Sequence, residues 1–256
     1  MSDMTGFLTI NIHTFNEENN IEESIKSAKL LSDTVQIIDM ESTDKTVTIA
    51  KRFGIKVLAL PQSRYVEPAR EFGIRKVTTD WVFILDADER LTPQLAEEIK
   101  KAVSSNEYSY YKIPRKNLFG KMKWLKYGNW WPDYQIRLIN KNHFEKWPKE
   151  IHSTPQIEGK QGFLNEPLLH FFHGDLEQMV NKTILFEDIE SDLLFKANRM
   201  TSTPIFFRKY FGELYRRLLR HFGFLDGSIG IIEGIYQAFS KTITYLFLYE
   251  KKSRSV

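Results

Sequence analysis

Apolar and polar residues alternate in a regular order along the N-terminal part of the chain. Short apolar runs rich in β-branched residues predict strands at residues 8–12, 35–38, 55–60 and 81–85. Between these runs, apolar residues recur at helical spacing and predict helices at residues 21–31, 47–53 and 66–77. Strands that alternate with helices over short connections predict a largely parallel sheet with right-handed crossovers. We therefore expect an α/β fold.

The rest of the chain predicts further strands and then helices. Thr92 and Pro93 are residue types that favour the N-cap and the first position of a helix. Strands of mixed direction are predicted at residues 109–113, 135–139 and 168–172. From residue 176 onward, long periodic stretches interrupted at 203–204 and 226–227 predict three helices. The predicted architecture is a mixed, mainly parallel sheet flanked by helices, with a C-terminal helical appendage.

Polar side chains follow three of the predicted strands. Residues 14–18 follow the first strand, Asp39 follows the second, and Asp86 and Asp88 follow the fourth. The carboxyl ends of parallel strands meet at one edge of a sheet, where open α/β folds bind their ligands. We therefore expect the loop at 14–18 to share a site with these three acids.

Asp86 and Asp88 flank a single alanine at the end of an apolar run. Mg²⁺ and Mn²⁺ prefer carboxylate oxygens and are often shared between one or two carboxylates and the phosphates of a substrate. The pair therefore indicates a nucleotide diphosphate held through Mn²⁺ or Mg²⁺. The alternative is a solvated turn in which Arg90 offsets the two negative charges.

Several segments resemble a known family of enzymes. Residues 9–28, 38–46 and 79–91 resemble family 2 glycosyltransferases of the GT-A fold. Residues 132–152 and 224–230 are similar to the branch that contains lipopolysaccharide-core β-1,4-glucosyltransferases. The resemblance implies a GT-A glycosyltransferase domain at residues 1–175, with a nucleotide half at about 5–103 and an acceptor half at about 104–175, and a C-terminal helical region at 176–256.

The resemblance also implies which residues bind the sugar donor. Asp88 is the expected metal ligand, and Asp86 is expected to meet the ribose or to share the ion. The expected nucleoside contacts are Thr14, Asn16, Glu17 and Asp39. Arg70 matches an arginine that is common in the family, and it either holds a phosphate or pairs with Glu67 or Glu71.

Inverting sugar transfer requires a base that removes the proton of the acceptor hydroxyl. By resemblance this base is Asp133, which follows the aromatic segment 127–132, although an aspartate after proline is also typical of a turn. Relatives often carry a glutamate where this chain has Ser153, which makes Glu150 the second candidate.

Three histidines are candidates for an additional metal ligand. The resemblance implies His152, and imidazole is a suitable ligand for Mn²⁺. His170 and His173 are alternatives, although alternating packing along a strand accounts for them equally well.

Composition and charge narrow the class of protein. The 256 residues contain no cysteine, which excludes a disulfide scaffold and thiolate chemistry and fits a reducing compartment. A formal net charge of +3 is too small to indicate a nucleic-acid partner. The N-terminal residues are polar and do not resemble a signal peptide, so we expect a cytoplasmic protein.

Aromatic and cationic side chains interleave at helical spacing between residues 206 and 220. Such a helix suits an anionic lipid surface, where aromatic rings enter the interface and cations meet the headgroups. Alternatively, one apolar face simply covers the catalytic domain while the arginines form the solvated face; its residues are Phe207, Phe211, Leu214 and Leu218. No run reaches the roughly 18 uninterrupted apolar residues of a membrane span. The first alternative predicts a protein that is peripheral on the inner face of the cytoplasmic membrane.

Together these patterns predict an inverting, metal-dependent glycosyltransferase. Its expected donor is a nucleotide-sugar, with a UDP-hexose preferred. Its expected acceptor is a hydroxyl of a glycan or lipid-linked molecule in cell-envelope and lipopolysaccharide synthesis. One alternative is a nucleotidyltransferase. Such an enzyme is expected to carry a glycine-rich phosphate loop after its first strand, and this chain has none there. The other alternative is a catalytically silent scaffold at the membrane.

Overall fold

The computed structural model describes residues 7–120, 123–150, 153–172 and 176–254. The chain forms two compact units. Unit 1 contains Met1–Lys116 and Asp133–His170, and unit 2 contains Asn117–Pro132 and Phe171–Val256. Segment 117–132 therefore groups with the C-terminal helices, although it is flanked in sequence by strands of unit 1.

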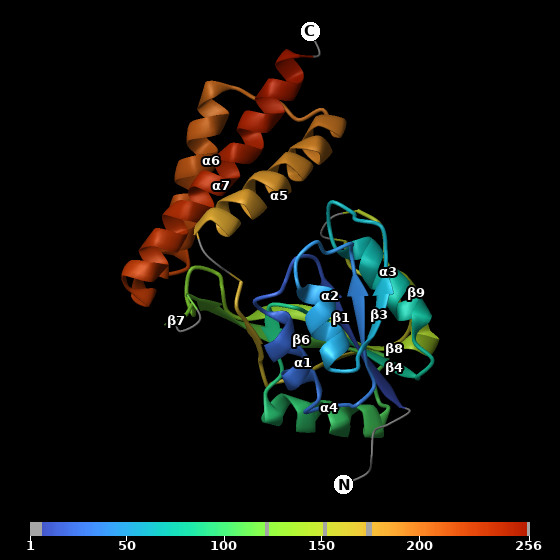
Figure 1. Ribbon diagram of the computed structural model, residues 1–256. Coiled ribbons are helices and arrows are strands. Elements are labelled where there is room, and N and C mark those ends of the chain that lie inside the picture. Colours follow the sequence, from blue (N-terminus) through green and yellow to red (C-terminus); the bar gives the residue numbers. More distant parts are fainter. Residues whose placement is uncertain (1–6, 121–122, 151–152, 173–175, 255–256) are drawn as a thin grey trace. The chain divides into compact units, whose positions relative to one another are not determined.

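Four parallel strands form one half of the sheet in unit 1 (Figure 1). They are β1 (Leu8–Thr14), β2 (Val35–Asp39), β3 (Lys56–Ala59) and β4 (Trp81–Asp86). The connecting helices are α1 (Ile21–Ala28), α2 (Thr46–Arg52) and α3 (Glu67–Lys76). β1 lies between β2 and β4, with Ile12 opposite Ile37 and Leu85. The predicted parallel half is therefore confirmed.

The other half of the sheet is mixed in direction. Its strands are β5 (Glu89–Arg90), β6 (Tyr110–Phe119), β8 (Asp133–Asn140), β11 (Gln161–Phe163) and β12 (Leu168–His170). β8 runs antiparallel to both β4 and β6, and the strand order is β3-β2-β1-β4-β8-β6-β12-β5. A 3₁₀ turn (Lys141–His143) leads into a separate pair made by β9 (Phe144–Lys146) and β10 (Gln156–Ile157). The three strands predicted here are confirmed as β6, β8 and β12.

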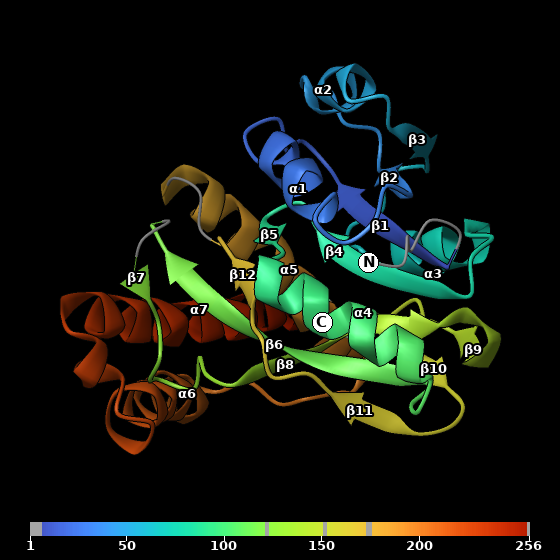
Figure 2. The same ribbon diagram turned by 90° about the horizontal axis from the view of Figure 1, so that it is seen from below.

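Among the described residues, three apolar clusters form the core of unit 1, and β4 contributes to the two largest of them. Phe83 and Leu85 of β4 belong to the larger cluster, whereas Val82 and Ile84 belong to the smaller one. The larger cluster takes in α1 and α4 (Pro93–Ser105), and α4 lies across the sheet in Figure 2. The smaller cluster includes Ile74 of α3. A strand buried on both faces needs apolar residues at successive positions, which explains the unbroken apolar sequence of β4.

Helix α4 has the beginning that its sequence predicts. Oγ1 of Thr92 accepts a hydrogen bond from the N–H of Leu95 at 3.1 Å, and Pro93 lies in the first turn. The helix ends at Ser105 and is capped by Asn106, whose φ of 48° is left-handed, a conformation that asparagine tolerates well. This helix begins a few residues after Asp86 and Asp88, so its capped start holds the chain in place just after these two acids.

Helices dominate unit 2. They are α5 (Leu176–Lys196), α6 (Thr203–Tyr215), a π-helical turn (Arg216–Arg220), a 3₁₀ turn (Gly223–Asp226) and α7 (Ser228–Ser253). α5 and α6 both pack along α7 (Figure 1), and the short strand β7 (Lys123–Trp124) pairs with the end of β6. The three predicted helices are confirmed. Within the described part of the chain, no helix is both long and apolar enough to cross a bilayer.

The 3₁₀ turn before α7 packs tightly in unit 2. A Cβ atom on Gly230 would lie 2.0 Å from the carbonyl oxygen of Gly223, so only glycine fits at this contact. Asp226 of the same turn is buried, and its Oδ2 accepts hydrogen bonds from the N–H groups of Lys126 (2.9 Å) and Tyr127 (2.8 Å). The turn and the segment around residue 126 are therefore held together.

Candidate active site

Two of the candidate acids end strands that flank β1. In the register of the sheet, Thr14 of β1 lies opposite Asp39 of β2, and His13 of β1 lies opposite Asp86 of β4. Parallel pairing thus brings Thr14, Asp39 and Asp86 to one edge of the sheet. This is the edge at which α/β folds bind ligands.

Asp39 is buried and fixed by its neighbours. Its Oδ1 accepts hydrogen bonds from Oγ1 of Thr14 (2.8 Å) and Oγ of Ser42 (2.6 Å), and its Oδ2 accepts one from the N–H of Ser42 (3.0 Å). A carboxylate bonded at three points keeps a single orientation. Such preorganisation is what a binding group needs in order to read a ligand.

The loop after β1 is tied to the loop after β2. Asn16 has a φ of 53°; its N–H donates to Oγ of Ser42 (2.9 Å), and its Oδ1 accepts from the N–H of Thr43 (2.8 Å). The N–H of Glu17 donates to Oγ1 of Thr46 (2.8 Å). A left-handed conformation suits asparagine because its short side chain bonds locally. Asn16 and Glu17 therefore belong to the pair of loops that surrounds the end of β2.

Asp44 holds the same two loops together. Its Oδ1 accepts from the N–H of Thr46 and its Oδ2 accepts from the N–H of Glu18, both at 2.9 Å. Burial acts to raise the pKa of Asp44, but the hydrogen bonds from Thr46 and Glu18 outweigh it and hold the pKa below its ordinary value. Asp44 is thus a structural group at the start of α2.

Asp86 is bonded to two arginines. Nη2 of Arg70 lies 3.1 Å from its Oδ1 and 2.9 Å from its Oδ2, and Nη2 of Arg137 lies 2.6 Å from Oδ2. Burial acts to raise the pKa of Asp86, but the charges of Arg137 and Arg70 hold that pKa well below its ordinary value. Glu71, a predicted partner of Arg70, pairs with Arg75 instead (2.7 Å). With both oxygens facing guanidinium groups, Asp86 is a poor candidate for a metal ligand.

A chain of alternating charges links Asp86 to Asp133. Nη2 of Arg137 also lies 2.6 Å from Oε1 of Glu89, and Glu89 is fully buried. Nη1 of Arg115 lies 3.5 Å from the same Glu89 oxygen, and Nη2 of Arg115 lies 2.7 Å from Oδ2 of Asp133. Opposite charges at each step offset the desolvation of these groups.

Sequence reasoning missed the middle of this chain, namely Glu89, Arg115 and Arg137 as a connected set. Arg137 could have been found, because it is a charged residue inside the apolar run of β8 and buried charges require partners. Arg115 gives no such signal, since Asp133 and Glu89 lie 18 and 26 positions away in sequence.

Asp133 begins β8 and faces Arg115 across the β6–β8 ladder. Its Oδ1 accepts a hydrogen bond from Nε2 of Gln135 (2.7 Å), and a quarter of its side chain (25%) is exposed. Glu150 is exposed, and its backbone carbonyl accepts from the N–H of Ser153 (3.2 Å). Among the described residues, no hydrogen bond or ion pair joins Glu150 to Asp133.

Asp88 lies in the turn between β4 and β5, next to a histidine of β12. Nε2 of His170 is 3.6 Å from Oδ2 of Asp88, and the two side chains are largely buried. The antiparallel pairing of β12 with β5 produces this contact, because it sets His170 opposite Glu89. His152 and His173, the other two candidate histidines, lie outside the described residues.

Asp88 and His170 offer an oxygen and a nitrogen donor for a divalent cation. In the described ranges, no group of three or more acidic, histidine or cysteine side chains could enclose a metal. Mg²⁺ and Mn²⁺ that bind together with substrate phosphates commonly take only one or two protein ligands. The residues present therefore fit an ion whose coordination is completed by phosphate oxygens.

His13 is a buried histidine at the end of β1, with 4% of its surface exposed. Burial lowers the pKa of His13 to about 3, against the opposing effect of the Asp86 charge. The imidazole is therefore neutral at physiological pH. It adds no positive charge to the strand-end cluster.

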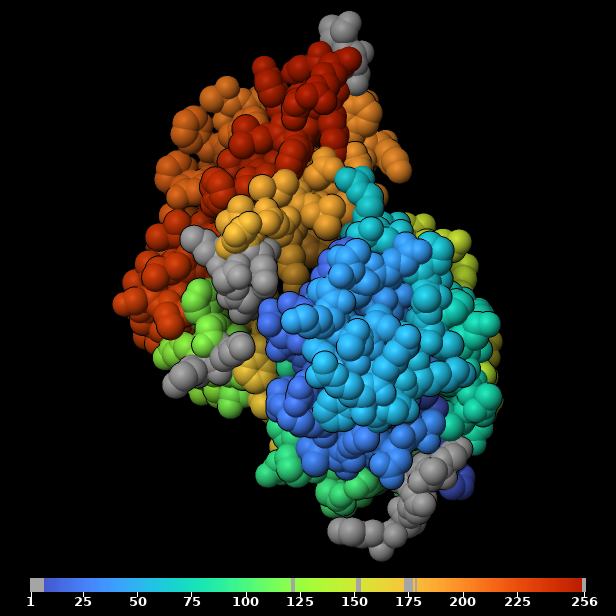
Figure 3. All heavy atoms as spheres, in the orientation of Figure 1, coloured from blue at the N-terminus to red at the C-terminus, as the bar shows by residue number. Residues whose placement is uncertain are grey.

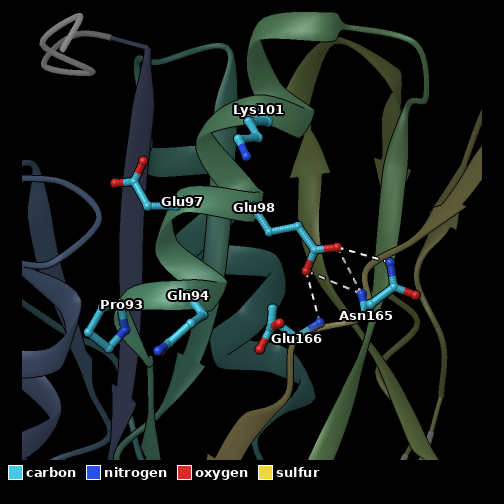
Figure 4. Close-up of a pocket in the computed structure, with 7 residues that line it drawn as sticks. All are labelled: Pro93, Gln94, Glu97, Glu98, Lys101, Asn165 and Glu166. Atoms are coloured by element: carbon cyan, nitrogen blue, oxygen red, sulfur yellow. Dashed lines mark hydrogen bonds between the residues drawn. The ribbon is translucent and has the colours of Figure 1, made fainter.

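A surface depression of about 570 Å³ lies beside α4 (Figure 4). Its lining residues are Pro93, Gln94, Glu97, Glu98, Lys101, Asn165 and Glu166. Glu98 accepts hydrogen bonds from the N–H groups of Asn165 (3.0 Å) and Glu166 (2.9 Å), so its carboxylate fastens the loop after β11 to α4. These lining residues include none of the candidate donor or catalytic groups, and we assign the depression no part in the site.

Known proteins resemble this chain in sequence and in fold. The family model for "Glycosyl transferase family 2" matches residues 9–156. An uncharacterized glycosyltransferase of Rickettsia conorii is 28% identical over 98% of this chain and 93% of its own length. One from Rickettsia typhi is 30% identical over 96% of this chain and 88% of its own. The structure of S. aureus TarS in complex with UDP-GlcNAc aligns with a TM-score of 0.51 at 13% identity, over 97% of this chain and 92% of the TarS chain.

These similarities establish the fold and the family. TarS shares a mixed α/β sheet flanked by helices, which confirms the predicted GT-A fold, although its sequence identity is too low to carry more. The family match covers more than half of the chain, from β1 to β10, and includes the strand ends that carry Asp39, Asp86 and Asp88. The protein is a glycosyltransferase, and its chain belongs to glycosyl transferase family 2.

Proposed function

We propose that this glycosyltransferase moves a hexose from a UDP-sugar, with inversion, to a hydroxyl of a glycan or lipid-linked acceptor in cell-envelope synthesis. The acceptor would be of the kind that enzymes of the lipopolysaccharide-core branch use, which is the branch that the chain resembles. The observation that carries the proposal is the adjacency of the β1, β2 and β4 ends, with Asp39 on one side of β1 and the Asp86–Asp88 turn on the other. TarS, which shares the fold, is found in complex with UDP-GlcNAc, and this supports a uridine donor.

Asp39 is the proposed contact to the nucleoside. A carboxylate offers only acceptors, so it is complementary to the N–H of uracil or to the hydroxyls of ribose. Thr14 and Ser42 already hold this side chain in one orientation, which reduces the entropy lost on binding. Asn16 and Glu17 would line the same pocket, because their loop is bonded to the loop after Asp39.

Asp88 with His170 is the proposed metal site. A divalent ion held there would offset the negative charge that develops on the departing diphosphate. Asp86, held by two arginines, would act as a fixed negative group toward the ribose. His152, which the family resemblance implies as a ligand, stays a further candidate.

Asp133 is the proposed base. The acceptor hydroxyl loses its proton as it attacks, so the base must be ionised and within hydrogen-bond reach. The ion pair with Arg115 fixes the position of the Asp133 carboxylate, and the exposed quarter of its side chain leaves an approach for the acceptor. Glu150 is the alternative base.

Nucleotide release tests this function. The purified protein is incubated with Mn²⁺ and with UDP-glucose, UDP-galactose or UDP-GlcNAc, and with GDP- and ADP-sugars for comparison. Release of UDP that requires both the metal and a uridine donor is the expected result. Turnover of only non-uridine sugars would contradict the donor assignment. Failure to bind any nucleotide in calorimetry would instead identify a silent scaffold.

A further inference from the structure

The connection between α6 and α7 and the first turns of α7 present large apolar side chains to solvent in unit 2. We call the six residues that do so the helical tip: Leu219, Phe222, Phe224, Leu225, Ile231 and Ile232. Their exposed fractions run from 41% for Ile231 to 58% for Leu219. Figure 3 shows the orange and red side chains of α6 and α7 at the molecular surface. Scattered apolar residues need no explanation, but a contiguous group marks an interaction surface.

The apolar surface continues along α6. Phe207, Phe211 and Tyr215 follow one another four positions apart, and each is 57–60% exposed. Residues at this spacing lie on one side of a helix. Phe207 and Phe211 stack on each other with their ring planes 9° apart, so the exposed rings present a continuous apolar stripe that runs toward the tip.

The exposed charges around this surface are positive. Arg208 and Arg220 are exposed. The three acids between residues 203 and 235 are either paired or buried. Glu213 pairs with Arg216 and Arg217, Asp226 is 6% exposed and Glu233 is 1% exposed. The surface of this described segment therefore combines exposed apolar side chains with exposed guanidinium groups.

We propose that the helical tip is a docking surface for an anionic lipid bilayer. Aromatic and aliphatic side chains of the tip would enter the interface between headgroups and acyl chains, while Arg220 and Arg208 meet the phosphates. A second copy of the chain is a poorer occupant, because it would bring the same guanidinium groups face to face. Docked in this way, the helices would lie along the bilayer surface.

The docked tip would carry the aromatic segment that precedes the candidate base. The N–H of Gly128 donates to the carbonyl of His221 (2.8 Å), and Nη1 of Arg217 donates to the carbonyl of Gly128 (2.9 Å). The guanidinium of Arg217 also lies over the ring of Trp130, 5.0 Å from its centre. These bonds, with those of Asp226, join segment 126–130 to the tip. Docking would thus place this segment at the headgroup level. A role for the segment in binding an acceptor there rests on the proposed lipid-linked acceptor.

Vesicle flotation tests the docking surface without any sugar donor. The full-length protein is mixed with vesicles of phosphatidylcholine alone, or of phosphatidylcholine with phosphatidylglycerol, and is centrifuged through a density gradient. We expect flotation with the anionic vesicles only, and a steep loss of flotation as salt screens the charges. Protein that stays at the bottom with anionic vesicles at low salt would overturn the proposal.

Two variants and a matched control locate the surface. Phe224→Ser with Leu225→Ser, and separately Arg220→Glu, should each weaken partitioning by roughly tenfold or more. Leu246→Ser is the control, because Leu246 is 52% exposed on α7 far from the tip, and it should bind as the parent does. All of these side chains are exposed, and circular dichroism checks that each variant is folded.

The outcomes separate this proposal from its rivals. An equal loss in Leu246→Ser would contradict the location of the surface. A dimer in light scattering that Phe224→Ser with Leu225→Ser dissociates, without vesicle binding by the parent, would show that the tip binds a second copy. UDP release in solution is measured on the same samples. Its failure would overturn the proposed reaction and leave the docking result standing.

Discussion

Arg137 and Asp86 form an ion pair within unit 1, with 2.6 Å between Nη2 and Oδ2. This pairing gives the two acids of the Asp-Ala-Asp segment different surroundings. The first acid is bonded by the protein's own arginines, whereas Asp88 lies beyond the strand end beside His170. Resemblance alone implied that both acids could share an ion. We therefore propose Asp88 as the ligand and Asp86 as a fixed charge.

Arg137→Met should destabilise the protein strongly. The substitution leaves the charges of Asp86 and the fully buried Glu89 without their shared partner, which should lower the free energy of unfolding by about 3–5 kcal/mol. Arg75→Met is the matched control, because it breaks the ion pair of a half-exposed arginine with Glu71 and should cost less than about 1 kcal/mol. Urea denaturation followed by circular dichroism measures both. Equal, small losses would show that the buried pair does not hold unit 1 together.

Asp133→Asn should separate donor binding from transfer. The amide keeps the size of the side chain but cannot accept the proton of the acceptor hydroxyl, so transfer should fall by roughly 100-fold to 10,000-fold. Affinity for the UDP-sugar should stay unchanged in calorimetry. Glu150→Gln is the companion variant and should transfer normally. The reverse pattern, with normal transfer in Asp133→Asn and loss in Glu150→Gln, would move the base to Glu150.

The stability of the protein should fall as the pH is lowered from neutral, and His13 should cause part of the fall. The folded chain holds His13 at a pKa of about 3, below its ordinary value of 6.5. Between these values the unfolded chain binds a proton that the folded chain does not, so acid favours unfolding. The loss from this group between pH 7.5 and pH 5 should be roughly 2 kcal/mol.

His13→Leu tests this assignment. The variant should lose the part of the pH dependence above pH 5, whereas His143→Leu, at an exposed histidine, should keep it. Asp86 does not interfere: its pKa is lowered, so its stabilising effect is lost only as the pH falls below the ordinary carboxyl value of 3.8. Urea midpoints at pH 7.5 and pH 5 supply the comparison. The same slope in His13→Leu and the parent protein would contradict the burial argument.

Two helical glycines in unit 2 should respond in opposite directions to alanine. Gly230→Ala would put its Cβ against the carbonyl oxygen of Gly223 and should destabilise by about 1–3 kcal/mol. Gly212→Ala meets nothing within 4 Å and should stabilise α6 by up to about 1 kcal/mol. Thermal unfolding followed by helical circular dichroism compares them. Similar melting temperatures for the two variants would mean that the turn does not pack as described.

The regular elements of this fold were predictable from sequence because each is long enough to show its period. The strands buried on both faces appear as unbroken apolar runs, such as that of β4, and Thr92 with Pro93 marks the start of α4. The short strands β9 and β10 and the extension of β6 to Phe119 were not predicted. Strands of two or three residues show no alternation, and only their partners define them.

The candidate site was predictable only in part, for a related reason. Strand order brings Asp39 and Asp86 to either side of β1, and parallel pairing dictates that much. The contact between Asp88 and His170 depends on β12 returning to pair with the two-residue strand β5, which no local pattern reveals. The pairing of Arg115 with Asp133 likewise depends on the register of β6 against β8.

Calorimetric titration with UDP tests the central claim most directly, namely that Asp88 holds the cation that binds the donor's diphosphate. The parent protein should bind UDP in the presence of Mn²⁺ and lose at least roughly tenfold in affinity when the metal is chelated. Asp88→Asn should bind with the lower affinity whether or not Mn²⁺ is present, while Glu97→Gln, at an acid beside the α4 depression, should behave as the parent does. Full dependence on Mn²⁺ in Asp88→Asn, or UDP binding by the parent that ignores the metal, would contradict the account.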